Sequence, residues 1–143
     1  MTILMALAMA EAAGSVTMNV GNVRNARGKV VVELCTQSTF LADSCALRAE
    51  APARAGTTTV TIPNVPAGHY AVQAFHDENA NGDVDRAMFG IPREGVGFSR
   101  NARITLSPPK WNDAYFVHQA RPETISFSLR YFMGAKGPAP LRH

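Results

Sequence analysis

The stretch PNVPAGHYAVQAFH, residues 63–76, decides the fold class of this chain. Residues 63–68 combine two prolines, an asparagine and a glycine, which is typical of a turn. After the turn the chain alternates: Tyr70, Val72 and Ala74 fall on one face of an extended chain, and their neighbours fall on the other. This period of two predicts a β-strand over residues 69–76.

The same alternation recurs along most of the chain, with turn residues between the runs. We expect further strands at residues 16–20, 29–35, 57–62, 102–107, 113–118 and 123–132. Residues 40–51 lack a sustained apolar face, so we expect a loop or a single turn there, followed by a strand. Short strands at this spacing predict an all-β fold, an antiparallel β-sandwich of about seven strands built from residues 14–133.

The composition is that of a globular chain. The 143 residues are 46% hydrophobic and 17% charged, with a formal net charge of +3. Because lysine and arginine are scattered singly, and no basic run is interleaved with aromatic residues, we expect no nucleic-acid partner. The apolar run at residues 3–10 is too short to cross a bilayer, so the protein is not expected to be membrane-spanning.

The two ends of the chain are expected to lie outside the sandwich. Small residues that suit a cleavage site follow the run at residues 3–10, an arrangement similar to a secretory signal peptide, although no lysine or arginine precedes it. Residues 1–13 are therefore a truncated signal peptide or a disordered N-terminus, and the first interpretation predicts a periplasmic or secreted protein. Residues 134–143 are rich in glycine and proline and predict a disordered tail.

The two cysteines, Cys35 and Cys45, are too far apart for a redox motif and too few for a metal finger. An even number of cysteines in an exported chain favours one disulfide, which would stabilise the fold by about 2.5–3 kcal/mol. The alternative is two unrelated buried thiols, which behave as small hydrophobic side chains.

An acidic segment at residues 76–99, HDENANGDVDRAMFGIPREGVGFS, is the best candidate for a functional site. Its first half matches the spacing D-x-[DN]-x-[DN]-G of calcium loops. Five residues would supply the oxygen ligands: Asp77, Asn79, Asn81, Asp83 and Asp85. The twelfth position, where calcium loops place a bidentate glutamate, is Met88, so Glu78 or Glu94 would have to supply that carboxylate by a fold of the chain. We expect either a weak structural calcium site or an acidic hairpin tip that holds no metal.

The second half of the segment has the composition of one long ordered loop. Glycine permits close backbone approach, proline fixes the backbone, and glutamate and serine side chains can bond backbone groups that need partners. We assign such structural roles to Gly90, Pro92, Glu94, Gly97 and Ser99. Ordered loops of this length are usually functional.

Three stretches carry a resemblance to a known family: NVPAGHYAVQAFHDENANGDVD at 64–85, FGIPREGVGFSRNAR at 89–103 and PPKWNDAYFVH at 108–118. With the flanking strands, which extend the likeness to roughly residues 15–132, the chain resembles a bacterial family of small secreted proteins, the domain of unknown function number two-one-four-one. Val65-Pro66 stands where that family has Leu-Pro. The resemblance implies export and a transthyretin-like or immunoglobulin-like sandwich, and it implies no reaction.

Two functional hypotheses follow. In the first, the protein is a secreted, non-catalytic module that binds an unidentified protein, peptide or carbohydrate through residues 76–99, with calcium as a structural pin. In the second, it is a hydrolase or metalloenzyme whose site combines His76, Asp77 and Glu94 with Asp113. We favour the first, because no nucleophile motif frames any serine and because adjacent strand residues such as His76 and Asp77 point to opposite faces. Under this hypothesis we interpret His76 as a strand-end residue that forms a hydrogen bond with the loop backbone.

The remaining histidines and aromatic residues give weaker signals. His69, His76 and His118 have no spacing that supports a zinc site. Trp111, Tyr115 and Phe116 form either a platform for a carbohydrate or peptide, or part of the core.

Overall fold

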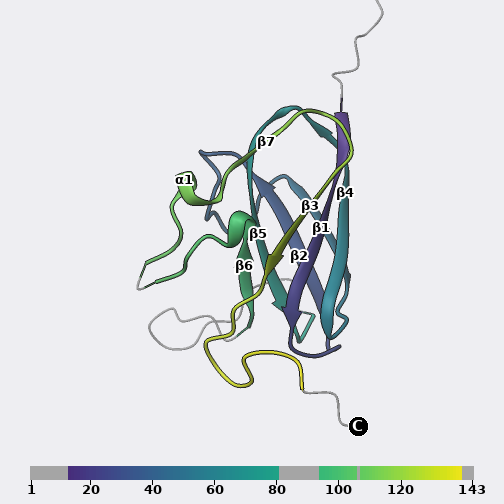
Figure 1. Cartoon of the computed structure of the whole chain (residues 1–143), viewed down its shortest axis with the longest axis vertical. Helices are drawn as coiled ribbons and strands as arrows, with labels where there is room; N and C mark the ends of the chain where they lie inside the picture. Colours follow the sequence, from purple (N-terminus) through teal and green to yellow (C-terminus); the bar gives the residue numbers. More distant parts are fainter. Residues whose placement is uncertain (1–12, 81–93, 106, 140–143) are drawn as a thin grey trace, which may run out of the picture.

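The protein is a sandwich of two β-sheets, seen in a computed structural model that describes residues 13–80, 94–105 and 107–139 (Figure 1). The three-stranded sheet has the order β4-β1-β8, with β1 at Ala13–Val23, β4 at Gly56–Pro66 and β8 at Glu123–Ser128. The larger sheet has the order β3-β2-β5-β6, with β2 at Lys29–Cys35, β3 at Leu47–Pro52, β5 at Gly68–Asp77 and β6 at Val96–Phe98. The short strand β7, Phe116–His118, also pairs with β5. A 3-10 turn η2, Ser99–Asn101, and one helical turn α1, Trp111–Ala114, complete the fold.

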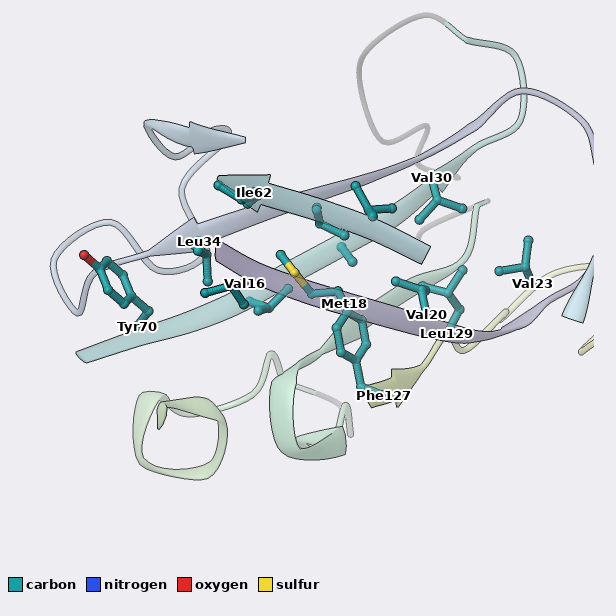
Figure 2. Packing of buried hydrophobic residues seen from close by; sticks show 14 of the residues in the cluster. Val16, Met18, Val20, Val23, Val30, Leu34, Ile62, Tyr70, Phe127 and Leu129 are labelled. Atoms are coloured by element: carbon teal, nitrogen blue, oxygen red, sulfur yellow. The ribbon is translucent and has the colours of Figure 1, made fainter. Parts of the chain in front are cut away.

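The core lies between the two sheets and follows from the alternation in the sequence. On β1, Val16, Met18 and Val20 are fully buried while the residues between them are not. They meet Val30 and Leu34 of the larger sheet and further residues of β5 and β8 in one cluster (Figure 2). The all-β sandwich predicted from the sequence is therefore confirmed.

Three expectations about the strands need correction. The pairing is not wholly antiparallel, since β1 and β8 run parallel, with Val16 opposite Glu123. The reason is that β7 ends beside the start of β1, where the His118 ring meets the Gly14 carbonyl, so the chain enters β8 from the end at which β1 begins. Residues 113–118 form α1 and then β7, and the strand expected at 123–132 ends at Ser128.

The strand expected at 102–107 is also absent from the described residues 102–105 and 107. Its alternation has another cause. Ala102 packs against Ala71 and Ala114, and Ile104 packs against Val31 and other residues of a second cluster. This segment thus covers the outer face of the larger sheet instead of joining a sheet.

The two sheets are joined directly at one edge. The Leu129 N–H donates to the Gly21 carbonyl of β1 at 3.0 Å, and the next residue, Arg130, exchanges two backbone hydrogen bonds with Val96 of β6, at 2.8 and 3.0 Å. The chain therefore crosses from one sheet to the other between Leu129 and Arg130. We call this edge the seam. Within the described part of the chain, no helix is long and apolar enough to cross a membrane.

Candidate functional site

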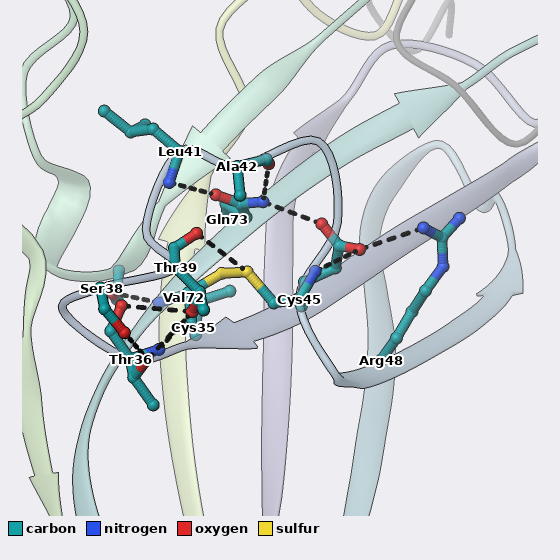
Figure 3. The surroundings of a disulfide bond; sticks show 12 residues. Cys35, Thr36, Ser38, Thr39, Leu41, Ala42, Cys45, Arg48, Val72 and Gln73 are labelled. Carbon is teal, nitrogen blue, oxygen red and sulfur yellow. Dashed lines mark hydrogen bonds and ion pairs between the residues drawn. A yellow bond between two sulfur atoms is a disulfide. The ribbon is translucent and has the colours of Figure 1, made fainter.

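The disulfide between Cys35 and Cys45 is present, and it closes the loop that follows β2 (Figure 3). A buried carboxylate holds the same loop. Glu33 is 1% exposed, and its two oxygens accept hydrogen bonds from Arg48 Nη1 at 3.0 Å, from Gln73 Nε2 at 2.9 Å and from the Cys45 N–H at 3.3 Å. Glu33 is not among the residues that the sequence patterns mark, although it is the only acidic residue within the apolar run of β2.

His76 lies at the end of β5 and is fully buried. Its Nε2 is 2.7 Å from the Arg27 carbonyl oxygen, and its Nδ1 is 2.8 Å from the Tyr131 hydroxyl. Because a carbonyl oxygen only accepts, Nε2 carries the proton, and in the neutral ring Nδ1 accepts from Tyr131. The Tyr131 oxygen in turn accepts the Arg24 N–H at 3.0 Å. His76 thus bonds the loop backbone, as the structural interpretation of the sequence predicts.

Burial controls the ionisation of this network. Loss of solvent lowers the pKa of His76 below 6.5, an effect that the hydrogen bond to Arg27 opposes but does not overcome. Burial also raises the pKa of Tyr131 to about 12. Both groups are therefore neutral near pH 7. Both ring nitrogens of His76 are thus engaged by protein groups, the Arg27 carbonyl and the Tyr131 hydroxyl.

The carboxylates next to His76 are also engaged. Burial by itself would raise the pKa of Glu78, but hydrogen bonds from Asn25, Arg24 and Arg27 outweigh it and hold that pKa below 4.5. The Glu78 N–H donates to Glu94 Oε2 at 2.6 Å. Glu94 therefore holds the backbone at the end of β5, the kind of structural contact that we assign to it from the sequence.

The calcium prediction falls partly outside the described residues. Asp77 is fully buried and Asn79 is exposed. Other residues assigned to this segment lie outside the part that the structure describes: Asn81, Asp83, Asp85, Gly90 and Pro92. Among the described residues, no group of three His, Cys, Asp or Glu side chains is placed to hold a metal ion. Calcium binding stays a prediction, which calorimetric titration of the protein with Ca²⁺ tests.

A row of stacked rings lies where β5 begins. The His69 ring stacks on Tyr115, with centroids 5.8 Å apart, and Tyr115 stacks on Trp111 at 5.6 Å with only 12° between the planes. Phe40, from the disulfide loop, packs edge-on against Trp111 at 5.9 Å. His69 is exposed, and Tyr115 and Trp111 are half-buried. We call His69, Tyr115 and Trp111 the ring row.

The ring row differs in its members from the aromatic platform that the sequence suggests. Trp111 and Tyr115 belong to it, whereas Phe116 packs against the main core. His69 was missed, because its place in the row depends on the pairing of β5 with β7, which no local pattern reveals.

Residues 18–126 match the model of a bacterial family described as "Uncharacterized protein conserved in bacteria (DUF2141)". The chain belongs to this family. No curated protein and no solved structure matches it. The resemblance seen in the sequence is thus confirmed at the level of the DUF2141 family, and the transthyretin-like topology stays a prediction.

The motif GVGFSRNA of this DUF2141 chain builds the seam. A Cβ atom on Gly97 would lie 2.9 Å from the Ser128 carbonyl oxygen, so β8 can approach β6 this closely only where there is no side chain. Ser99 is 2% exposed, and its hydroxyl donates to the Ala114 carbonyl at 2.6 Å and accepts the Val72 N–H at 2.9 Å. The Asn101 side-chain oxygen accepts the Ser128 N–H at 2.9 Å. These three residues tie β6 and η2 to β5, α1 and β8.

The other residues considered for catalysis lie apart in this DUF2141 fold. Asp113 is exposed on α1, whereas His76 is buried at the opposite end of β5 from His69. His118 is 1% exposed; its Nδ1 contacts Glu123 Oε1, and its Nε2 lies 3.1 and 3.2 Å from the Val65 and Gly14 carbonyl oxygens. The three histidines therefore serve three separate places in the sandwich.

Proposed function

We propose that the protein is an exported, non-catalytic binding module and that the ring row is its ligand-binding surface. The observation that carries this proposal is the partly exposed stack of His69, Tyr115 and Trp111. Aromatic side chains offer a large apolar area together with a polar edge, and they are enriched where proteins recognise ligands and partners.

Three further observations support the proposal. Asn112 and Asp113 are exposed on α1 beside Trp111, where they supply hydrogen-bonding groups next to the rings. The hydroxyl of Ser99 and both nitrogens of His76 are engaged in bonds that hold the fold, which argues against their use in catalysis. The Cys35–Cys45 disulfide suits an oxidising compartment, the periplasm or the exterior of the cell.

An apolar surface flanked by amide and carboxylate groups suits a neutral, extended ligand, either a soluble glycan or a proline-containing peptide. Sugar rings and prolines both present flat apolar faces, and proline-rich segments are known to dock between aromatic side chains. Sugar hydroxyls or peptide backbone groups would then bond Asn112 and Asp113.

The chain offers a direct assay, because Trp111 is its only tryptophan. Titration with soluble oligosaccharides or with proline-rich peptides should shift or quench the Trp111 emission in a saturable way. Tyr115→Ala should abolish the change. Phe132→Ala, which removes a half-buried ring outside the row, is the matched control and should bind as the wild type does. Binding that survives in Tyr115→Ala would place the ligand elsewhere.

A further inference from the structure

A pocket of about 240 Å³ opens at the seam, between η2 and the end of β8. Its lining includes three apolar residues, Phe98, Ala102 and Ile104. It also includes three polar residues, Asn101, Ser128 and Arg130. Ligand sites combine these two features, an apolar lining and a few polar groups that fix orientation. Drug-sized sites span roughly 300–1,000 Å³, so this pocket suits a smaller molecule.

The polar lining residues carry hydrogen-bond donors. The Asn101 side-chain oxygen is occupied by the Ser128 N–H at 2.9 Å, so the group that Asn101 still offers is its NH₂. Arg130 gives one N–H to the Ile104 carbonyl in a long bond of 3.4 Å, and a guanidinium has five N–H groups. Ser128 is exposed, lines the same pocket and carries a hydroxyl. A charged guanidinium beside an amide NH₂ and a hydroxyl is a set of groups that suits an anion, above all a carboxylate.

The backbone holds these donors in place. Arg100 and Asn101 have φ of 59° and 49°, so two successive non-glycine residues adopt the left-handed conformation. Such residues cost free energy and persist only where the surrounding structure imposes them. Here the bonds from the Arg100 guanidinium to the Asn112 and Tyr115 carbonyls and from Ser128 to Asn101 impose the conformation. The pocket is therefore largely formed before a ligand binds.

We propose that this pocket binds a small carboxylate with an apolar body. The carboxylate accepts hydrogen bonds from Arg130 and Asn101, and the apolar body packs on Phe98, Ala102 and Ile104. Arg103 lies nearby in sequence but outside the pocket lining, so it offers a matched control for the charge of Arg130. No lining residue of the site belongs to the ring row, and the proposal does not rest on the proposed function.

Benzoate is a suitable probe, because it joins a carboxylate to a compact apolar ring. Backbone amide NMR of the whole protein should show saturable shifts at Gly97, Asn101, Ala102 and Ser128 as benzoate is added. Benzamide has the same ring without the charge and should bind at least about tenfold more weakly, since hydrogen bonds between charged groups are about twice as strong as neutral ones.

Two pairs of variants test which groups matter. Arg130→Gln should weaken benzoate binding at least about tenfold, whereas Arg103→Gln, which removes the same charge just outside the pocket, should change it less than about twofold. Asn101→Asp keeps the oxygen that accepts from Ser128 and replaces the NH₂ with a negative charge, so the fold should persist while benzoate binding is lost.

Several outcomes would overturn the proposal. One is the lack of any saturable shift around the pocket in wild type. Others are equal affinity for benzoate and benzamide, or equal losses of benzoate affinity in Arg130→Gln and Arg103→Gln. This test uses benzoate, amide shifts and variants of the pocket, whereas the ring row is tested with other ligands and with Tyr115→Ala, so a failure here leaves the proposed function to its own test.

Discussion

Replacing Tyr131 with phenylalanine isolates the hydroxyl at the centre of the buried network. The ring is kept, and with it the packing beside Gly95 and the contact of the Arg24 guanidinium, 4.5 Å above the ring centroid. The variant loses two hydrogen bonds at once: the one that Tyr131 donates to His76 Nδ1 at 2.8 Å, and the one that it accepts from the Arg24 N–H at 3.0 Å.

The size of the loss follows from burial. His76 is fully buried and Tyr131 is 4% exposed, so water cannot readily replace the missing hydroxyl. A buried donor or acceptor left without a partner costs about 1–3 kcal/mol, and here one of each is left, at His76 and at Arg24. Allowing for partial relaxation, we expect Tyr131→Phe to lower the unfolding free energy by about 2–4 kcal/mol.

Urea denaturation at pH 8, with the disulfide intact, measures this loss while His76 is neutral. Tyr70→Phe is the matched control, because it makes the same chemical change at a second buried tyrosine. The Tyr70 hydroxyl donates to the Pro66 carbonyl at 2.9 Å, and Pro66 is half-buried, so water can solvate that carbonyl. We expect a cost of about 1 kcal/mol for Tyr70→Phe. If Tyr131→Phe costs no more than this control, the network does not stabilise the fold as argued.

Three further predictions concern ionisation, the disulfide and the seam. NMR titration of the His76 ring should give a midpoint below 6.5, because the folded protein favours the neutral ring. His76 therefore does not lower the unfolding free energy above pH 6.5, and it lowers that free energy increasingly as the pH falls from 6.5 toward the midpoint. The double variant Cys35→Ala/Cys45→Ala should lose about 2.5–3 kcal/mol of unfolding free energy in denaturant, and a reducing agent should bring wild type to the same unfolding midpoint. An unchanged midpoint would show that the disulfide does not stabilise the fold by constraining the unfolded chain. Gly97→Ala should lose about 1–3 kcal/mol, because its Cβ would lie 2.9 Å from the Ser128 carbonyl oxygen. Gly21→Ala should lose less, because the closest atom to its Cβ would be the movable Ser128 hydroxyl at 3.1 Å; equal losses would argue against the steric role of Gly97 at the seam.

Local patterns in the sequence predicted the strands that carry a full alternation. The expected strand at 29–35 matches β2, and the one at 69–76 lies within β5. The three residues of β6 are too few for a pattern to show, and their pairing with β5 depends on tertiary contacts. The strand predicted around Ile104 was wrong for a different reason. Alternation indicates only that every second residue is buried, and a loop packed on a sheet produces the same pattern as a strand.

Some features of the candidate sites could also be predicted from the sequence, and others depend on tertiary contacts. The pairing of Cys35 with Cys45 follows from the number of cysteines, and the structural interpretation of His76 follows from its place at the end of a strand. The hydroxyl that meets His76 comes from Tyr131, 55 residues further along, and nothing near either residue marks the other as its partner. The same holds for Asn101 and Ser128, which meet only because the chain crosses between the sheets.

The motif that carries the family resemblance therefore has structural roles in the sandwich. Gly97 makes room for β8, Ser99 joins β5 to α1, and Asn101 holds the N–H of Ser128. Each contact reaches an element far away in the sequence, and together they close the sandwich at the seam. Asn101 also lines the pocket at the seam, together with Arg130. A loss of binding in a variant of Gly97 or Ser99 would thus report on the fold, whereas Arg130 is exposed and lies outside the motif, so its substitution separates ligand binding from closure of the sandwich.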